Sequence, residues 1–386
     1  MPVRSLSRIA KPAILALALS LASLFAGAAR AQLGKRVMTT AGTPEDKAVT
    51  EIYAASDPAA KIALLDKFMA DLGKGEFELL GDQIYVATYL EQKNYPKVYE
   101  YGEKAMKLDP NDFGTLAKMV QAAGEAGDTA KIFDLGERAG KILTQYKAAD
   151  AADESAKTAK AQVLEDNASE IGGVEYAMYS AATKSAAPIE KAGLMERYAA
   201  AFPDSPYTKD ARDTAAISYL QAQKNDKMIE VAQKNLAADP DDVRMLLLLA
   251  DYWSEKGTPA QLDKSAAYAQ KAIDVLAAAK KPEGVSDDDW KNQVALQQGV
   301  AYAAMGMVYV NKGKNPQAID AFKKASPLLK ADNVSYGRNL YRWGFTLAKM
   351  RRLPEAKVVL NQAIAVDSPY KALAKQTLDT ISTRAN

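Results

Sequence analysis

Apolar residues recur every three or four positions along most of the chain. The spacing is clear in residues 62–72, 84–89 and 98–108. It is the period of a helix with one buried face, and the period-two alternation typical of strands is not sustained anywhere. The pattern predicts an all-α protein whose helices, about 12 to 16 residues long, are joined by short turns.

The chain also contains an internal duplication. Residues 58–127 align without a gap to residues 188–257, with 15 identities over 70 positions, where about five would arise by chance. Phe68/Tyr198 and Lys67/Arg197 are among the conservative pairs. Two blocks of helices with a common origin are therefore expected.

Both blocks carry an acidic, proline-containing stretch at the same place, LDPND (108–112) and ADPDD (238–242). The carboxylates could form a small cation loop, but neither the glycine turn nor the downstream glutamate of a calcium loop follows. A proline stops a helix, and an aspartate just after it caps the next one. The stretches are therefore predicted to be helix junctions, with Asp112 and Asp242 as caps. Ser286, followed by three aspartates, is predicted to begin a helix in the same way.

One segment, AYAAMGMVYVNKGKNPQAIDAFKKA (301–325), carries a recognisable signature. It resembles the tetratricopeptide repeat (TPR), and looser copies extend the resemblance to about two thirds of the expected mature chain. The resemblance implies a right-handed superhelix, or α-solenoid, of helix-turn-helix pairs in which a small residue of the first helix admits an aromatic residue of the second. The matching residues are Tyr302, Met305, Gly306, Tyr309, Gly313, Ala318, Phe322 and Ala325.

The predicted organisation has five parts. A signal peptide (1–31) precedes a TPR-like block (32–146), a less regular helical linker with a hinge (147–187), a second block (188–280) and a C-terminal TPR pair (281–386). Within the linker, residues 147–166 are expected to form a solvated helix. Gly172 and Gly173 mark the candidate hinge.

The N-terminus has the layout of a secretory signal. Three basic residues precede an apolar run (13–26), and Ala29-Arg30-Ala31 offers a cleavage site before Gln32. The run is shorter than the roughly 20 residues that span a bilayer, so a retained anchor is the weaker alternative. The sequence predicts a periplasmic or secreted protein without stable membrane insertion after cleavage. Short resemblances near residues 64 and 194 favour TPR proteins of the bacterial cell envelope.

Composition narrows the chemistry. The chain has no cysteine and no histidine, which excludes disulfides, thiolate sites, lipid attachment through cysteine and most zinc sites and hydrolytic triads. Four of the 50 basic residues lie in the expected signal, which leaves 46 against 48 acidic residues. This balance favours neither nucleic acid nor an anionic membrane surface as a partner. No enzyme activity, cofactor or metal is predicted.

The candidate partner-binding residues lie at positions that line the groove in TPR proteins. Arg338, Arg342 and Lys349 follow one another at intervals of four and seven, on one face of a predicted helix. An acidic peptide or chain terminus could bind there, although a solvated charged face explains them as well. The other candidates are Gln83, Gln121, Arg244, Asp251, Met307 and Asn311.

The sequence therefore predicts a non-enzymatic interaction or scaffold protein that binds a peptide or partner protein in a concave groove. Two alternatives remain open. One is a self-assembling structural subunit, and hence a homo-oligomer. The other is a glycan-binding protein or enzyme built on helical repeats. A TPR-like fold supports binding only as a class of function.

Overall fold

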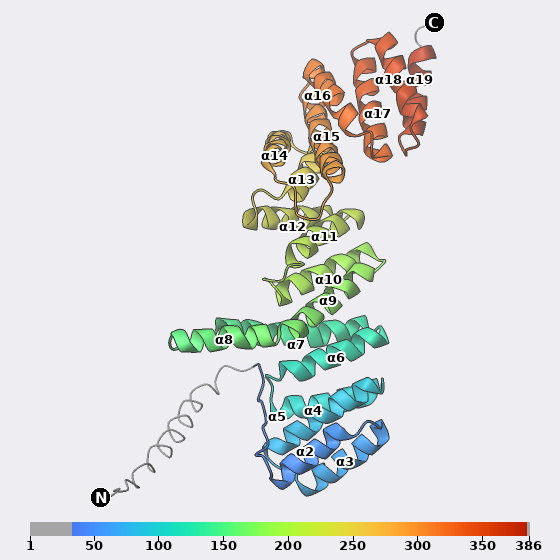
Figure 1. The fold of residues 1–386 in the computed structure, drawn as a ribbon. Coiled ribbons are helices and arrows are strands. Elements are labelled where there is room, and N and C mark those ends of the chain that lie inside the picture. Colours follow the sequence, from blue (N-terminus) through green and yellow to red (C-terminus); the bar gives the residue numbers. More distant parts are fainter. Residues whose placement is uncertain (1–32, 384–386) are drawn as a thin grey trace, which may run out of the picture. The chain divides into compact units, whose positions relative to one another are not determined.

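The computed structural model describes residues 33–383, so the predicted signal peptide lies outside the described residues. The described part of the chain contains helices and no strand, and helices that are neighbours in sequence pack together (Figure 1). This confirms the predicted all-α fold of TPR-like helix pairs. The helices are α2 (Pro44–Ala54), α3 (Pro58–Asp71), α4 (Glu76–Glu91), α5 (Tyr95–Leu108), α6 (Phe113–Ala126), α7 (Thr129–Ala148), α8 (Glu154–Asp166), α9 (Ala168–Lys184), α10 (Pro188–Ala201), α11 (Thr208–Gln221), α12 (Asn225–Ala238), α13 (Val243–Lys256), α14 (Pro259–Ala278), α15 (Asp287–Asn311), α16 (Asn315–Leu328), α17 (Asn333–Lys349), α18 (Leu353–Ala365) and α19 (Lys371–Thr383).

The chain divides into two compact units, and the boundary between Ala211 and Arg212 falls within α11. In unit 1, α4 packs on α5 and α6 packs on α7. The helical spacing predicted at its start becomes a buried cluster, because the apolar faces of α2, α3 and α4 meet. Its fully or nearly fully buried members are Ile52, Leu65, Phe68, Ile84 and Tyr85.

Unit 2 repeats the arrangement with the pairs α13 and α14, α15 and α16, and α17 and α18, and α19 packs on α18. The strongest TPR match forms α15 and α16. A Cβ added to Gly306 would lie 2.4 Å from the ring of Phe322, and Phe322 is completely buried. The small residue therefore admits the aromatic one, as the resemblance implied.

The helix junctions were also predicted correctly. Helix α5 ends at Leu108, two residues before Pro110, and Asp112 accepts a hydrogen bond from the backbone N–H of Thr115. In the second block Asp242 caps α13 in the same way. Ser286 likewise caps α15. Each cap satisfies an amide that has no partner inside its helix.

The duplicated blocks have matching helix bounds. Three helices of the first block, α3, α5 and α6, begin and end 130 positions before α10, α12 and α13. Each of the six contains 14 residues. Helices α4 and α11 also end 130 positions apart, but α11 begins two residues later than this offset gives. Apart from that start, the gapless sequence alignment corresponds to a gapless alignment of helices.

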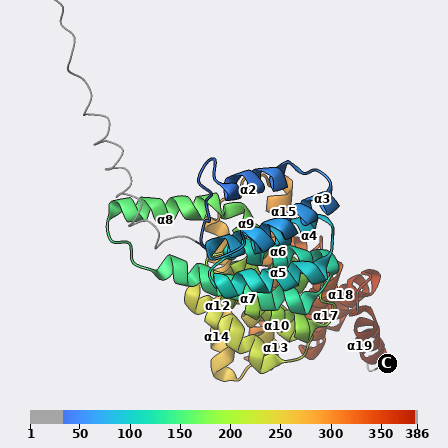
Figure 2. The same cartoon turned by 90° about the horizontal axis from the view of Figure 1, so that it is seen from below.

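The predicted linker is helical. Helix α8 has no buried residue, as expected for a solvated helix, and Figures 1 and 2 show it extending away from the other helices of unit 1. The stretch expected to be a less regular hinge instead forms the continuous helix α9, which passes through Gly172 and Gly173. It packs on α6, α7 and α10, because Val174, Met178 and Ala182 are buried. The domain boundaries proposed from the sequence otherwise stay predictions.

Candidate binding surfaces

The groove candidates named from the sequence lie mainly on three helices of unit 2. Arg244 and Asp251 belong to α13, Met307 and Asn311 to α15, and Arg338, Arg342 and Lys349 to α17. In a helix-pair repeat these are the first helices of successive pairs, which place their side chains on one common face.

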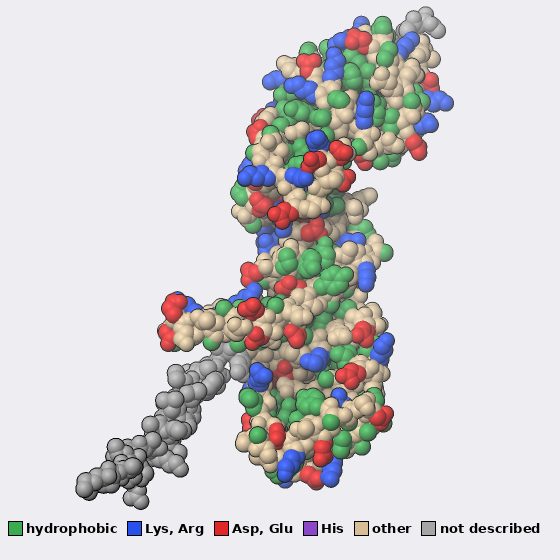
Figure 3. All heavy atoms as spheres, viewed as in Figure 1, with side chains coloured by type: hydrophobic (Ala, Val, Ile, Leu, Met, Phe, Trp, Pro, Cys, Tyr) green, Lys and Arg blue, Asp and Glu red, His purple; other side chains and the backbone are tan. Residues whose placement is uncertain are grey.

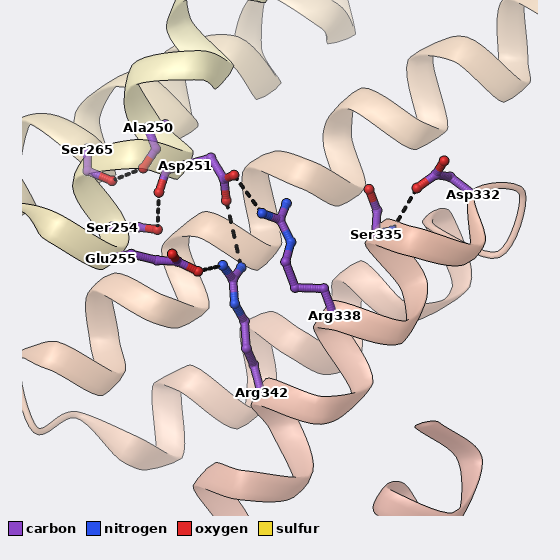
Figure 4. A network of polar contacts seen from close by, with 9 residues as sticks. All are labelled: Ala250, Asp251, Ser254, Glu255, Ser265, Asp332, Ser335, Arg338 and Arg342. Atoms are coloured by element: carbon purple, nitrogen blue, oxygen red, sulfur yellow. Dashed lines mark hydrogen bonds and ion pairs between the residues drawn. The ribbon is translucent and has the colours of Figure 1, made fainter. Parts of the chain in front are cut away.

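Two arginines of α17 meet two carboxylates of α13. Nη1 of Arg338 lies 2.7 Å from Oδ2 of Asp251, and Nη1 of Arg342 lies 3.7 Å from Oδ1 of the same carboxylate (Figure 4). Arg342 also donates through Nη2 to Glu255. The two arginines are four residues apart on α17, and the two carboxylates are four residues apart on α13. Each helix therefore presents two like charges on one face. We call these four residues the arginine clamp.

The clamp is partly buried. The side chain of Arg342 is 6% exposed and that of Arg338 is 20% exposed. Burial lowers the pKa of Arg342, and the charge of Asp251 opposes that effect only in part. For the more exposed Arg338, burial is outweighed by the charge and hydrogen bond of Asp251, so its pKa is raised. Both guanidinium groups keep their charge, since arginine is not deprotonated in proteins.

The clamp changes what the two arginines offer to a partner. Their charges are matched within unit 2, so an acidic peptide would have to compete with Asp251 and Glu255 for them. Binding of such a peptide there stays a prediction. Lys349 is exposed at the end of α17, and no ion pair of the described residues joins it to the clamp.

Two of the remaining unit 2 candidates, Asn311 and Arg244, have partners within unit 2. Asn311 donates to the backbone carbonyl of Ser254, 2.6 Å away, and so ties the end of α15 to α13. Arg244 lies 3.7 Å from the buried carboxylate of Asp213. Met307 is half-buried on α15.

A cavity of about 570 Å³ adjoins the clamp, and Asp251 and Glu255 contribute to its wall. Its lining comes from α11, the turn after α11, the first residue of α12, and helices α13 and α15. The apolar lining residues are Ile217, Leu220, Leu247, Leu248 and Val300, and polar ones include Gln223, Asn225, Arg244 and Gln297. We call this cavity the unit 2 groove. Aliphatic side chains that can be covered, together with polar groups that can fix orientation, are typical of ligand-binding sites.

Unit 1 has two neighbouring cavities that share Lys118 of α6. One, of about 750 Å³, lies between α6 and α9 and includes Gln121. The other, of about 640 Å³, includes Gln83 and is lined by α4, α6 and residues 33–37. The part played by residues 33–37 was not predicted, because this short stretch has no helical period.

The charge on the face shown in Figure 3 does not single out a further site. On the face shown in Figure 3, acidic and basic side chains are interspersed over both units. Among residues 33–383, no group of three or more histidine, cysteine, aspartate or glutamate side chains is arranged to hold a metal ion. No helix in the same range is long and apolar enough to span a bilayer.

Comparisons with known proteins leave the chain without a family assignment. No family model matches it, and no curated protein matches it. Similar solved structures include yeast Tom70, which is 10% identical, with 88% of this chain and 95% of that chain covered and a TM-score of 0.28. Another is the APC/C hetero-tetramer Cut9-Hcn1, which is 12% identical, with 88% and 77% covered and a TM-score of 0.28. The fold described above rests on the helices of this chain alone.

Proposed function

We propose that this protein is a non-enzymatic interaction protein that binds a segment of a partner protein in the unit 2 groove. The observation that carries the proposal is the cavity of about 570 Å³ lined mainly by α11, α13 and α15, in which aliphatic side chains lie beside polar ones and which the arginine clamp borders. Apolar side chains of a partner would fill the cavity, and Arg244 and Gln297 would fix the register of its backbone.

The clamp supports this function by holding the groove in shape. It ties α17 to α13, which are 87 residues apart at the paired positions. A preformed groove loses little conformational entropy when it binds, so more of the contact energy appears as affinity.

We further propose that the protein works in the bacterial cell envelope, in the periplasm or outside the cell. The support is the basic, apolar and small-residue pattern of residues 4–31. Mass spectrometry of the N-terminal peptide from envelope fractions tests this. A peptide that begins at Gln32 supports export and cleavage, whereas one that retains residues 1–31 contradicts cleavage.

Partner binding is tested by two substitutions of the same chemistry. Leu248→Glu places a charge in the groove, and Val358→Glu places one on α18, where Val358 is 60% exposed. We expect the mature protein and the Val358 variant to retain the same partner from envelope extract, and the Leu248 variant to lose it. Equal retention by both variants contradicts binding in this groove. A stable homo-oligomer with no other protein retained would favour the structural-subunit alternative.

A further inference from the structure

Residues 33–37 form an extended strap across the junction of α5 and α6. In Figure 1 the dark-blue stretch passes α5 on its way to α2. The backbone N–H of Lys35 donates to Oδ2 of Asp109 at 2.5 Å. Leu33 is 7% exposed and anchors the strap. We call these five residues the N-terminal strap.

Gly34 is required by the geometry of this contact. A Cβ at this position would lie 3.0 Å from Cα of Asp112 and 3.4 Å from the backbone oxygen of Asn111. Its φ of +108° is also one that other residues rarely adopt. The strap therefore presents a defined pattern, namely a buried leucine, a glycine against the junction, and a free backbone amide for a carboxylate.

The acceptor is a feature of the junction. Asp109 is 4% exposed, and its other carboxylate oxygen accepts from the backbone N–H of Asn111 at 3.1 Å. Its counterpart in the second block, Asp239, makes the same contact with Asp241 but is half-buried. A buried carboxylate needs donors, and at Asp109 the strap supplies one from outside the junction.

The strap also forms one wall of the cavity of about 640 Å³ in unit 1. The opposite walls carry Gln83 and Glu91 of α4 and Thr115 and Lys118 of α6. Space remains open beside the strap, but its contacts to Asp109 and to the junction backbone become available to another extended segment only when the strap leaves.

We propose that this part of unit 1 is a second binding site, specific for extended segments that carry a leucine-glycine pair followed by a residue with a free amide. The strap is its occupant within the chain, and a partner segment of the same chemistry replaces it. This site is separate from the unit 2 groove, so it does not depend on the function proposed there. A tethered occupant acts at an effective concentration in the millimolar range, so it excludes weak competitors until a stronger segment arrives.

The test uses the mature protein and a fluorescent peptide of residues 32–40. Leu33→Asp/Lys35→Pro disables the strap, because it charges the anchor and removes the amide that Asp109 accepts. Lys35→Ala is the matched control, since it keeps that amide. Residues 33–37 lie outside every helix, so far-UV circular dichroism should be unchanged in both.

We expect the peptide to bind the strap-disabled protein at least about tenfold more tightly than the wild type or the Lys35→Ala control. A peptide with Gly34→Val should not bind. Equal binding to all three proteins, or no binding to a strap-disabled protein with intact helices, overturns the proposal. Hydrogen exchange in the unmodified protein gives an independent check. A protected Lys35 amide supports the docked strap, and an amide that exchanges at the free-peptide rate refutes it.

Discussion

Helices α6 and α13 are counterparts in the two blocks, yet they use one pair of positions differently. In α6 the pair is Gln121 and Glu125, and Nε2 of Gln121 donates to Glu125 at 2.9 Å. In α13 the pair is Asp251 and Glu255, two carboxylates that the arginines of α17 neutralise. Glu125 also accepts from the hydroxyl of Tyr95 on the neighbouring helix α5, at 3.0 Å. The α6 pair thus carries one charge beside an open cavity, whereas the α13 pair carries two charges that a distant helix neutralises.

A second set of counterparts shows the same trend. Gln83 of α4 donates to Asp112 at 2.8 Å, and its counterpart Asp213 is a buried carboxylate with Asn235 at 3.4 Å and Arg244 at 3.7 Å. The first block has Ala105 and Gly114 where the second has Asn235 and Arg244. The two blocks share helix ends and junctions. Positions on the helix faces differ in charge, and the charged side chains of the second block have partners within unit 2.

The largest effect is expected from breaking the clamp. Arg342→Ala removes the packing of a buried side chain, leaves the half-buried Asp251 with one cation and leaves the exposed Glu255 with none. It should lower the unfolding free energy of unit 2 by about 2 to 4 kcal/mol. Trp253, Trp290 and Trp343 are all the tryptophans of the chain and all lie in unit 2, so urea titration followed by their fluorescence isolates this transition. Arg352→Ala, which removes a more exposed pair with Glu355, should cost less than about 1 kcal/mol. Similar losses in the two variants would contradict the role of the clamp.

Unit 1 should respond to pH through Asp82, a carboxylate of α4 that is 2% exposed and whose counterpart is Arg212. Burial raises the pKa of Asp82 from 3.8 to about 6, with Glu78 adding to the shift and Lys104 opposing it. At a pH between these two pKa values, Asp82 is protonated in the folded state and ionised in the unfolded state. The free energy of unfolding of unit 1 therefore falls as pH rises from about 4 through 6. The loss should reach about 2 to 3 kcal/mol.

Far-UV circular dichroism of urea unfolding at pH 4.5 and 7.5 measures this loss. Asp82→Asn should flatten the dependence, and Asp71→Asn, at an exposed position at the end of α3, should leave it in place. A dependence that persists in Asp82→Asn would assign it to other groups.

Reversing the charges of the clamp tests whether its parts act as a unit. Arg338→Glu/Arg342→Glu and Asp251→Arg/Glu255→Arg should each destabilise unit 2. The fourfold variant should recover about 1 to 3 kcal/mol relative to the sum of the two losses. Strict additivity of the losses would mean that the pairs are not coupled.

The smallest effect is expected from making α6 resemble α13. Gln121→Asp creates like charges at positions i and i+4 on an exposed face, which costs about 0.2 to 0.5 kcal/mol. The reverse change, Asp251→Gln, removes a partner of both arginines and should cost more, about 1 to 2 kcal/mol. Urea unfolding followed by circular dichroism measures the loss of stability in each variant. Equal losses in Gln121→Asp and Asp251→Gln would contradict the difference drawn between α6 and α13.

Features set by neighbours in sequence could be predicted from the sequence. The caps at Asp112 and Asp242, the solvated α8 and the fit of Phe322 against Gly306 each follow from a local pattern. A regular helix α9 was not expected, because Gly172 and Gly173 indicated a hinge. The helix forms because the burial of Val174 and Met178 against other helices outweighs the low helix propensity of the two glycines.

The sites depend on pairings between distant positions. The repeat pattern places Arg338, Arg342 and Asp251 among the groove residues, but it does not show that they pair. The matching intervals of Asp251 and Glu255 and of Arg338 and Arg342, four residues each, are the signal that could have suggested the clamp. The strap gave no such signal, because its contact depends on the backbone of Gly34 and Lys35 approaching a junction 74 residues away.

In the proposed function, a partner segment lies in the unit 2 groove. A photo-crosslinking amino acid at Leu248, in the groove, compared with one at Val358, on the exposed face of α18, tests it most directly in cells. We expect one discrete adduct from position 248, containing a segment of a single partner protein, and none from position 358. The same adducts from both positions, or adducts from position 358 alone, would contradict the claim.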